Sequence, residues 1–254
     1  MRVAAIMAGE PRFCREFDLF LNNLTNYQSV DWYMFFWANS RAGGTHGFDL
    51  VAPNWLNVDR EWAMEKLKSV LPETHRIAGL VLADRTQVVT PNITNKAGET
   101  DVERMWGMYN SLHQVDLLRR SAEQQLGDYD LVIRARPDVG LRGPIDLKEL
   151  SEIVATNKRA IITPNTEVHG YGHRMNDMIA FGSTHSMTAY CNAVQWIPEY
   201  HNRGLIFHPE TMLAYHCRAQ QLEVIEKDFG ELVLRKLGTQ VPNGPYLSNF
   251  GHWA

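Results

Sequence analysis

A run of apolar residues in the middle of the chain ends in two arginines and an aspartate. Residues 129–133 have the β-branched, apolar centre of a buried strand, and Arg134, Arg136 and Asp138 follow it directly. Burying these charges without partners would be costly, so they should lie at the end of the strand and face something polar. A guanidinium fork suits phosphate, and a carboxylate suits a divalent cation or a ribose hydroxyl. Together the three residues predict a site for a nucleotide diphosphate.

The same spacing also fits an arrangement that needs no ligand. Arg136 and Asp138 can form an ion pair with each other that fixes the turn after the strand. The spacing of the residues does not separate this interpretation from the ligand site.

Alternating strand and helix patterns surround this segment and must position it. Strands are predicted at residues 3–8, 31–38, 77–82, 129–134, 160–163, 178–181 and 222–225. Helices are predicted at residues 12–24, 59–71, 100–126, 185–194 and 209–221. For the third helix we expect Thr100 and Glu103 to form a capping box. Strands that alternate with helices imply parallel βαβ units, whose ligands bind beyond the carboxyl ends of the strands.

The pattern predicts an α/β fold with one domain over residues 1–254. We expect a mostly parallel central sheet flanked by helices, with residues 239–254 as a C-terminal tail that packs back on it. Three widely spaced cysteines, Cys14, Cys191 and Cys217, predict buried thiols rather than disulfides.

The composition argues against several classes of protein. With 44% hydrophobic and 21% charged residues, the chain is typical of a folded globular protein. A net charge of -4 offers no broad attraction to nucleic acid. The opening apolar run is too short for a signal peptide, and no run of about 18 apolar residues could span a bilayer. We therefore expect a cytoplasmic protein without a transmembrane segment or a nucleic-acid partner, and the oligomeric state stays open.

Three segments in combination resemble a known family. They are Arg-x-Arg-x-Asp at 134–138, Asn-Asp-x-x-Ala-Phe-Gly-Ser at 176–183 and His-Pro-Glu-Thr-x-Leu at 208–213. The combination resembles glycosyltransferases related to the WavE-type lipopolysaccharide-synthesis proteins, from about residue 129 onward and in the opening strand. The resemblance implies a GT-A-like (Rossmann-like) fold that uses a nucleotide sugar as donor. It also implies an acceptor hydroxyl on a surface polysaccharide or a lipid-linked glycan.

The resemblance leaves the need for a metal open. In such enzymes an Asp-x-Asp motif after a central strand binds ribose and metal; Asp138 matches its last carboxylate, but Arg136 stands at its first position. An arginine can neutralise the leaving diphosphate and replace part of the role of Mn2+ or Mg2+. His252 is a second candidate metal ligand, because several GT-A enzymes bring a C-terminal histidine back to the metal. A histidine in a tail is more often merely exposed.

Residues after the opening strand are candidates for nucleotide binding, because GT-A-like folds hold the base and ribose there. Gly9 allows close approach of the backbone, and Arg12 can reach a phosphate. A plain tight turn before a helix explains Gly9 and Pro11 equally well, so Arg12 is the stronger candidate.

Two acidic residues are candidates for catalysis. Asn176 and Asp177 precede a predicted strand and would place an amide and a carboxylate near the donor sugar, although turn chemistry is the alternative. Glu210 lies in the first turn of a predicted helix, where the helix dipole favours negative charge without any function. A carboxylate there also suits a general base for an acceptor hydroxyl.

Two other functions stay open. A catalytically inactive nucleotide- or carbohydrate-binding module would also show an altered aspartate motif. A metal-dependent hydrolase is suggested by the ten histidines, above all His169 and His173. Glycine on both sides of Tyr171 indicates a flexible loop that does not preset two zinc ligands, so a mobile lid over the donor is the better interpretation there.

Overall fold

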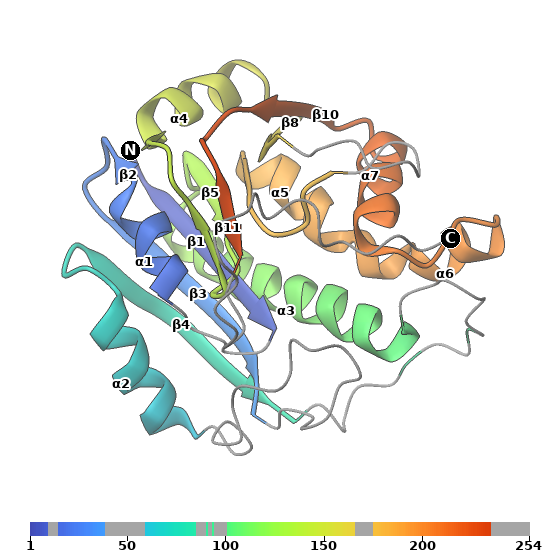
Figure 1. The fold of residues 1–254 in the computed structure, drawn as a ribbon, viewed down its shortest axis with the longest axis horizontal. Helices are drawn as coiled ribbons and strands as arrows, with labels where there is room; N and C mark the ends of the chain where they lie inside the picture. Colours follow the sequence, from blue (N-terminus) through green and yellow to red (C-terminus); the bar gives the residue numbers. More distant parts are fainter. Residues whose placement is uncertain are drawn as a thin grey trace, which may run out of the picture.

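A seven-stranded sheet runs through the computed structural model, which describes residues 1–9, 15–38, 59–84, 90, 93, 101–165 and 175–234. Its strands lie in the order β10-β8-β9-β5-β1-β3-β4 (Figure 1). They span Val3–Gly9 (β1), Val30–Trp37 (β3), His75–Ala83 (β4), Leu131–Arg134 (β5), Ala160–Pro164 (β8), Ala180–Gly182 (β9) and Glu223–Lys227 (β10). All neighbouring strands are parallel except for the two pairs that β9 makes with β5 and β8. The predicted α/β class and the mostly parallel sheet are confirmed.

Helices cover both faces of this sheet (Figure 1). One face carries α1 (Arg15–Asn22), α2 (Arg60–Val70) and α4 (Leu147–Thr156). The other face carries α3 (Val102–Leu126), α5 (Thr184–Cys191), the 3-10 helix η3 (Asn192–Gln195), α6 (Ile197–Asn202) and α7 (Pro209–Ala219). Successive strand residues supply the two cores in turn, as Ile133 and Val132 do in β5. None of the helices in the described part of the chain has the length and apolar character that a bilayer span requires.

Two short strand pairs lie beside the main sheet. β2 (Leu24–Thr25) runs parallel to β7 (Ile145–Asp146), and β6 (Val139–Leu141) runs antiparallel to β11 (Leu232–Leu234). The second pair brings the segment after β5 together with a segment almost 100 residues later, so it fixes the chain directly after Asp138.

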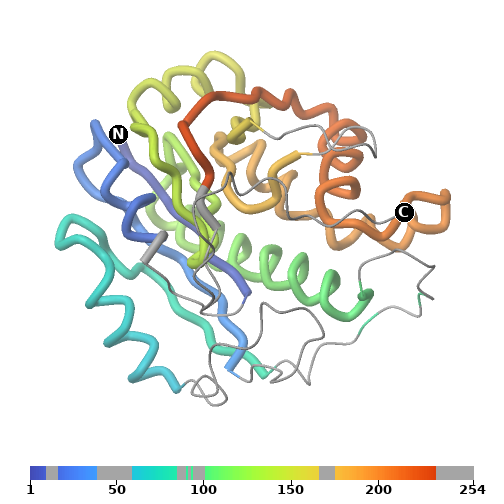
Figure 2. The backbone as a smooth tube through the Cα atoms, in the orientation of Figure 1, coloured from blue at the N-terminus to red at the C-terminus, as the bar shows by residue number. Residues whose placement is uncertain are grey.

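The strand order reverses between β1 and β5. The chain builds outward from β1 to β3 and β4, and α3 then returns it to β5 on the other side of β1. Figure 2 shows the result: the early, blue-to-cyan strands and the late, yellow-to-red ones lie on opposite sides of β1. In open α/β sheets, ligands bind outside the carboxyl ends of the strands at such a reversal. Gly9 and the residues that follow Arg134 therefore lie where a ligand is expected.

The direction of β9 decides which residues join this edge. Ala180 lies opposite Arg134 and Gly182 opposite Val132, so the start of β9 lies beside the end of β5. The parallel units expected from the sequence would have placed the residues before β9 at the opposite edge. The antiparallel strand instead brings Asp177 to the end of β5.

Some predicted helix boundaries need correction. The N-cap of α3 is Asp101, whose carboxylate accepts a hydrogen bond from the Arg104 amide at 2.8 Å, so the predicted capping box of Thr100 and Glu103 is wrong. The helix predicted over 185–194 is α5 followed by η3. Its N-cap is Ser183, whose Oγ accepts from the Ser186 amide at 3.0 Å.

His75 makes the stability of the fold sensitive to pH. Its Nδ1 accepts a hydrogen bond from Trp32 Nε1 at 2.9 Å, because an indole only donates. Its Nε2 therefore carries the proton and donates to Tyr27 Oη at 2.9 Å. Burial lowers the pKa of His75 from 6.5 to about 4, so the unfolded chain binds a proton where the folded chain does not.

We expect the free energy of unfolding to be highest above pH 6.5 and to fall as the pH drops towards 4. The share due to His75 should be roughly 2 kcal/mol between pH 7 and pH 5. Urea denaturation at both pH values measures this difference, and His75→Gln should remove that share. A variant with the same pH dependence as the wild type would contradict the assignment.

Candidate functional site

Arg136 and Asp138 form an ion pair just after β5. Nε and Nη2 of Arg136 donate to the two carboxylate oxygens of Asp138 at 2.9 and 2.8 Å. This ion pair is the alternative to a ligand site that the sequence analysis gave. The Arg136 side chain is 29% exposed and that of Asp138 is 13% exposed, so the pair lies at a rim and not in the core.

Arg134 lies in quite different surroundings. It is only 2% exposed, and its Nη1 donates to the Met178 carbonyl at 3.0 Å. Its Nε has no hydrogen-bond partner, and no described carboxylate forms an ion pair with the guanidinium. A buried charge without a counter-charge is strongly unfavourable, so an anionic group bound here would stabilise the folded protein.

Asn176 and Asp177 turn out to have different roles. Asn176 Oδ1 accepts hydrogen bonds from the amides of Met178 and Ile179, both at 2.9 Å, and so closes the turn that leads into β9. Asp177 takes no part in this turn. Although it is only 6% exposed, no described residue forms a hydrogen bond or an ion pair with its carboxylate. Turn chemistry therefore explains Asn176 but not Asp177.

Charged groups from separate parts of the chain converge beside the Arg136–Asp138 pair. Burial lowers the pKa of Arg136, but the carboxylates of Asp138, Asp177 and Glu210 together outweigh it and raise that pKa. Tyr109 on α3 has two of the same carboxylates as neighbours. Burial is the main reason why its pKa is raised, and the negative charges of Asp177 and Glu210 raise it further. The structure therefore brings together the four charged residues that the sequence singled out at 136, 138, 177 and 210.

His208 is a residue of this edge that the sequence analysis did not assign to the site. It precedes α7, and its Nδ1 lies 3.0 Å from Glu210 Oε2 and 3.3 Å from Thr211 Oγ1. Tyr109 Oη donates to the Pro209 carbonyl at 2.7 Å, which ties the start of α7 to α3. The sequence did contain a signal for this residue, because His208 and Glu210 flank the proline that marks the start of the helix.

Of the other predicted site residues, the structure describes Gly9. Gly9 has φ +111°, and a Cβ added there would meet nothing within 4 Å. Its backbone conformation therefore requires glycine, which supports the tight turn. Arg12, Pro11, the loop with His169, Tyr171 and His173, and the tail with His252 lie outside the described residues.

The described residues were expected to include a ligand for a divalent cation. In that part of the chain, no group of three or more His, Cys, Asp or Glu side chains could hold a metal ion. Asp138, the carboxylate expected to bind Mn2+ or Mg2+, has both oxygens hydrogen-bonded to Arg136.

Two buried tyrosines next to the site differ in whether the hydroxyl forms a hydrogen bond, so they can be compared directly. The Tyr190 hydroxyl has no hydrogen-bond partner, whereas that of Tyr109 donates to Pro209. Tyr190→Phe should leave the free energy of unfolding unchanged or slightly higher, while Tyr109→Phe should lower it by about 1 kcal/mol. Urea denaturation of both variants measures this, and equal losses would mean that the Tyr190 hydroxyl has a partner.

Comparison with known proteins adds no family to this picture. No protein-family model matches the chain, and no curated protein matches it either. Any proposal for the function must therefore be based on the charged residues where the strand order of the sheet reverses.

Proposed function

We propose that the chain is a glycosyltransferase that moves a sugar from a nucleotide-sugar donor to an acceptor hydroxyl. One observation carries the proposal: two nearly buried and oppositely charged groups, Arg134 and Asp177, lie at the reversal of the sheet without ion-pair partners among the described residues. A nucleotide sugar offers what both lack, because its diphosphate is an anion and its sugar carries hydroxyl donors. The acceptor is proposed to be a glycan or a lipid-linked glycan.

Each residue has a proposed role. Arg134 and the rim residue Arg136 neutralise the diphosphate as it departs, which should be the largest contribution to catalysis. Asp177 accepts hydrogen bonds from the donor sugar, and Asp138 accepts them from the ribose. Glu210 acts as the general base that removes the proton from the acceptor hydroxyl.

A GT-A-like fold is part of this proposal. The reversal of strand order beside β5 and the charged segment directly after that strand support it. No step is assigned to a metal, because no group of three or more candidate ligands lies in the described part of the chain.

A binding module without turnover is the second candidate. The Arg136–Asp138 pair favours it, since a carboxylate held by its neighbouring arginine is less available to a ligand. Such a module would still bind a nucleotide or a carbohydrate at Arg134 and Asp177.

A thermal-shift screen with nucleoside diphosphates, with and without Mn2+, tests the binding site. A ligand that binds only the folded chain raises its stability, by about 2.7 kcal/mol at 100 times its dissociation constant. Sugar nucleotides with the matching base then test turnover, measured as release of the nucleoside diphosphate. Binding with release supports the transferase, and binding without release supports the module. No shift with any nucleotide would contradict the transferase and a nucleotide-binding module, and would leave only a module that binds a carbohydrate.

A further inference from the structure

Three buried polar groups on one face of the sheet have no hydrogen-bond partner in the described part of the chain. They are Nε of Arg134 on β5, the hydroxyl of Thr163 on β8 and the hydroxyl of Tyr190 on α5. Arg134 is 2% exposed, and the other two side chains are completely buried. Such groups are costly in a folded protein, so most buried polar groups bind something.

The register of the sheet brings Arg134 and Thr163 into one row. Ala180 on β9 lies opposite Arg134 on one side. On the other side Ile162 lies opposite Phe181, so Thr163 comes next to Ala180 as well. Residues in one row point to the same face, and Ala180 belongs to the core under α3 and α5. Within this row only the methyl group of Ala180 separates the two polar side chains, whose Cα atoms are roughly 10 Å apart.

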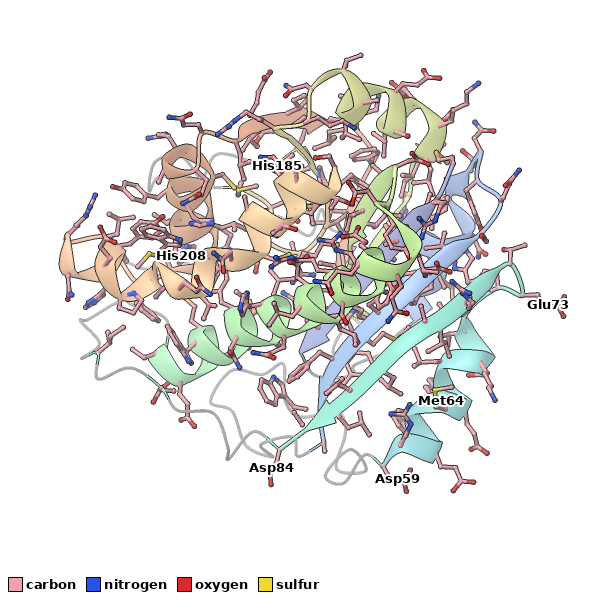
Figure 3. All side chains as sticks on the ribbon, turned by 180° about the vertical axis from the view of Figure 1, so that it is seen from behind. Asp59, Met64, Glu73, Asp84, His185 and His208 are labelled. Atoms are coloured by element: carbon pink, nitrogen blue, oxygen red, sulfur yellow. The ribbon has the colours of Figure 1, made fainter. Side chains whose placement is uncertain are left out.

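Hydrogen bonds to α3 fix the direction of helix α5. Thr184 Oγ1 donates to Glu123 Oε1 at 2.7 Å, and one turn later Thr188 Oγ1 accepts from Arg119 Nη2 at 2.9 Å. The two helices therefore lie antiparallel, and Figure 3 shows them side by side, with the labelled His185 near the start of α5. Because α3 leads directly into the start of β5, α5 runs from the start of β5 towards its end.

Tyr190 then lies above the row of Arg134 and Ala180. A Cβ added at Gly182 would lie 2.6 Å from Ser186 Oγ, so this part of α5 packs directly on β9. Tyr190 follows Ser186 by one turn, about 6 Å along the helix, and Ala180 lies about 7 Å from Gly182 along the strand. Burial raises the pKa of Tyr190 well above its usual value, and among charged groups Arg134 opposes this most. The three groups without partners therefore meet around Ala180.

We propose that Arg134 Nε and the hydroxyls of Thr163 and Tyr190 bind the sugar-linked phosphate of the nucleotide-sugar donor. This inference rests on the proposed function. Three donors around one small side chain suit an oxyanion, which accepts several hydrogen bonds, and the guanidinium supplies the opposite charge. Both hydroxyls are closed to solvent, so the side chains around them must move when the phosphate enters.

Asp177 favours a phosphate that carries a sugar over a free phosphate. Arg134 Nη1 donates to the Met178 carbonyl at 3.0 Å, so the residue that follows Asp177 contacts the guanidinium. The Asp177 carboxylate is nearly buried and has no hydrogen-bond partner among the described residues. A free phosphate would meet this negative charge, whereas a sugar on the phosphate would offer hydroxyl donors to it.

Dissociation constants of hydroxyl variants test the proposal. The probes are the sugar nucleotide that gives the largest thermal shift, its nucleoside diphosphate, and inorganic phosphate alone. Thr163→Val and Tyr190→Phe each remove one hydroxyl with little change of shape. Each should weaken binding of the sugar nucleotide and of the nucleoside diphosphate by about tenfold or more, because a hydrogen bond to a charged group is lost. Without added ligand, neither variant should unfold at a lower urea concentration than the wild type, because neither hydroxyl has a partner among the described residues.

Tyr33→Phe is the matched control. Tyr33 is also a buried tyrosine on this face of the sheet, but its hydroxyl is hydrogen-bonded to Tyr129 Oη at 2.7 Å. This variant should unfold at a lower urea concentration and should bind each probe as the wild type does.

Asp177→Asn distinguishes the two sources of phosphate. Loss of the negative charge should tighten the binding of inorganic phosphate. The same substitution should weaken the binding of the sugar nucleotide, whose hydroxyls lose a charged acceptor.

Three results would overturn the inference. Unchanged affinity for the sugar nucleotide in both Thr163→Val and Tyr190→Phe would remove these hydroxyls from the site, and lower stability of both variants without ligand would give them a structural role instead. Tighter binding of the sugar nucleotide by Asp177→Asn would mean that the sugar does not contact Asp177. The proposed function would fail in the wild type itself, which would then release no nucleoside diphosphate, whatever the variants do.

Discussion

Replacing Asp177 with asparagine should lower nucleotide-sugar turnover by about 100-fold or more and should not destabilise the protein. The substitution keeps the shape of the side chain and removes its charge. Because no described residue forms a hydrogen bond or an ion pair with this carboxylate, the folded chain loses only the electrostatic attraction between Asp177 and Arg136. Stability should therefore stay nearly the same. Steady-state kinetics and urea denaturation of the same preparations measure both effects.

Asp116 on α3 is the matched control for this substitution. It is also buried, but its Oδ1 accepts hydrogen bonds from Arg119 Nε and Nη2 at 3.1 and 2.6 Å. Asp116→Asn should therefore destabilise the protein and leave the turnover of the folded fraction intact. If Asp177→Asn behaved in the same way, Asp177 would be a structural residue and the proposed sugar contact would be wrong.

Replacing Arg119 with methionine should lower the free energy of unfolding by about 3–5 kcal/mol. The buried guanidinium contacts two carboxylates, those of Asp116 and Glu123, and the hydroxyls of Thr184 and Thr188. Its removal would leave two negative charges buried close together without a cation. Urea denaturation measures the loss, which should be smaller at low pH, because burial raises the pKa of Asp116 and this carboxylate then takes up a proton.

An exposed ion pair provides the comparison for Arg119. Arg142 and Glu231 join the segments of β6 and β11, and their side chains are 61% and 52% exposed. Arg142→Met should change stability very little, because solvent screens such pairs. Similar losses in both variants would contradict the role assigned to burial.

The central strands could be predicted because their apolar runs are nearly continuous. β1, β3 and β5 are buried on both faces, so each run ends where the strand ends, and all three predictions are confirmed. The short strands β2, β6, β7 and β11 were not predicted, because two or three residues become a strand only through a distant partner. Helix α4 was also missed, although Asp146 caps it by accepting from the Lys148 and Glu149 amides.

The site could be predicted by residue type but not by arrangement. The sequence identified Arg134, Arg136, Asp138, Asp177 and Glu210, but nothing local distinguishes the paired Arg136 from the unpaired Arg134. The three residues of β9 have the same apolar pattern in either direction, so only the sheet reveals which edge receives Asp177. The division of labour between Asn176 and Asp177 likewise depends on the turn that forms.

The antiparallel strand also constrains the order in which the sheet can be assembled. β8 leaves the ribosome before β9, yet in the finished sheet it pairs with β9 on one side and with β10 on the other. Until residues 180–182 are synthesised, the open edge of β5 and the whole of β8 lack their neighbours. Unpaired edges recruit other chains, so nascent protein that stalls between these two strands should be the form most prone to aggregate.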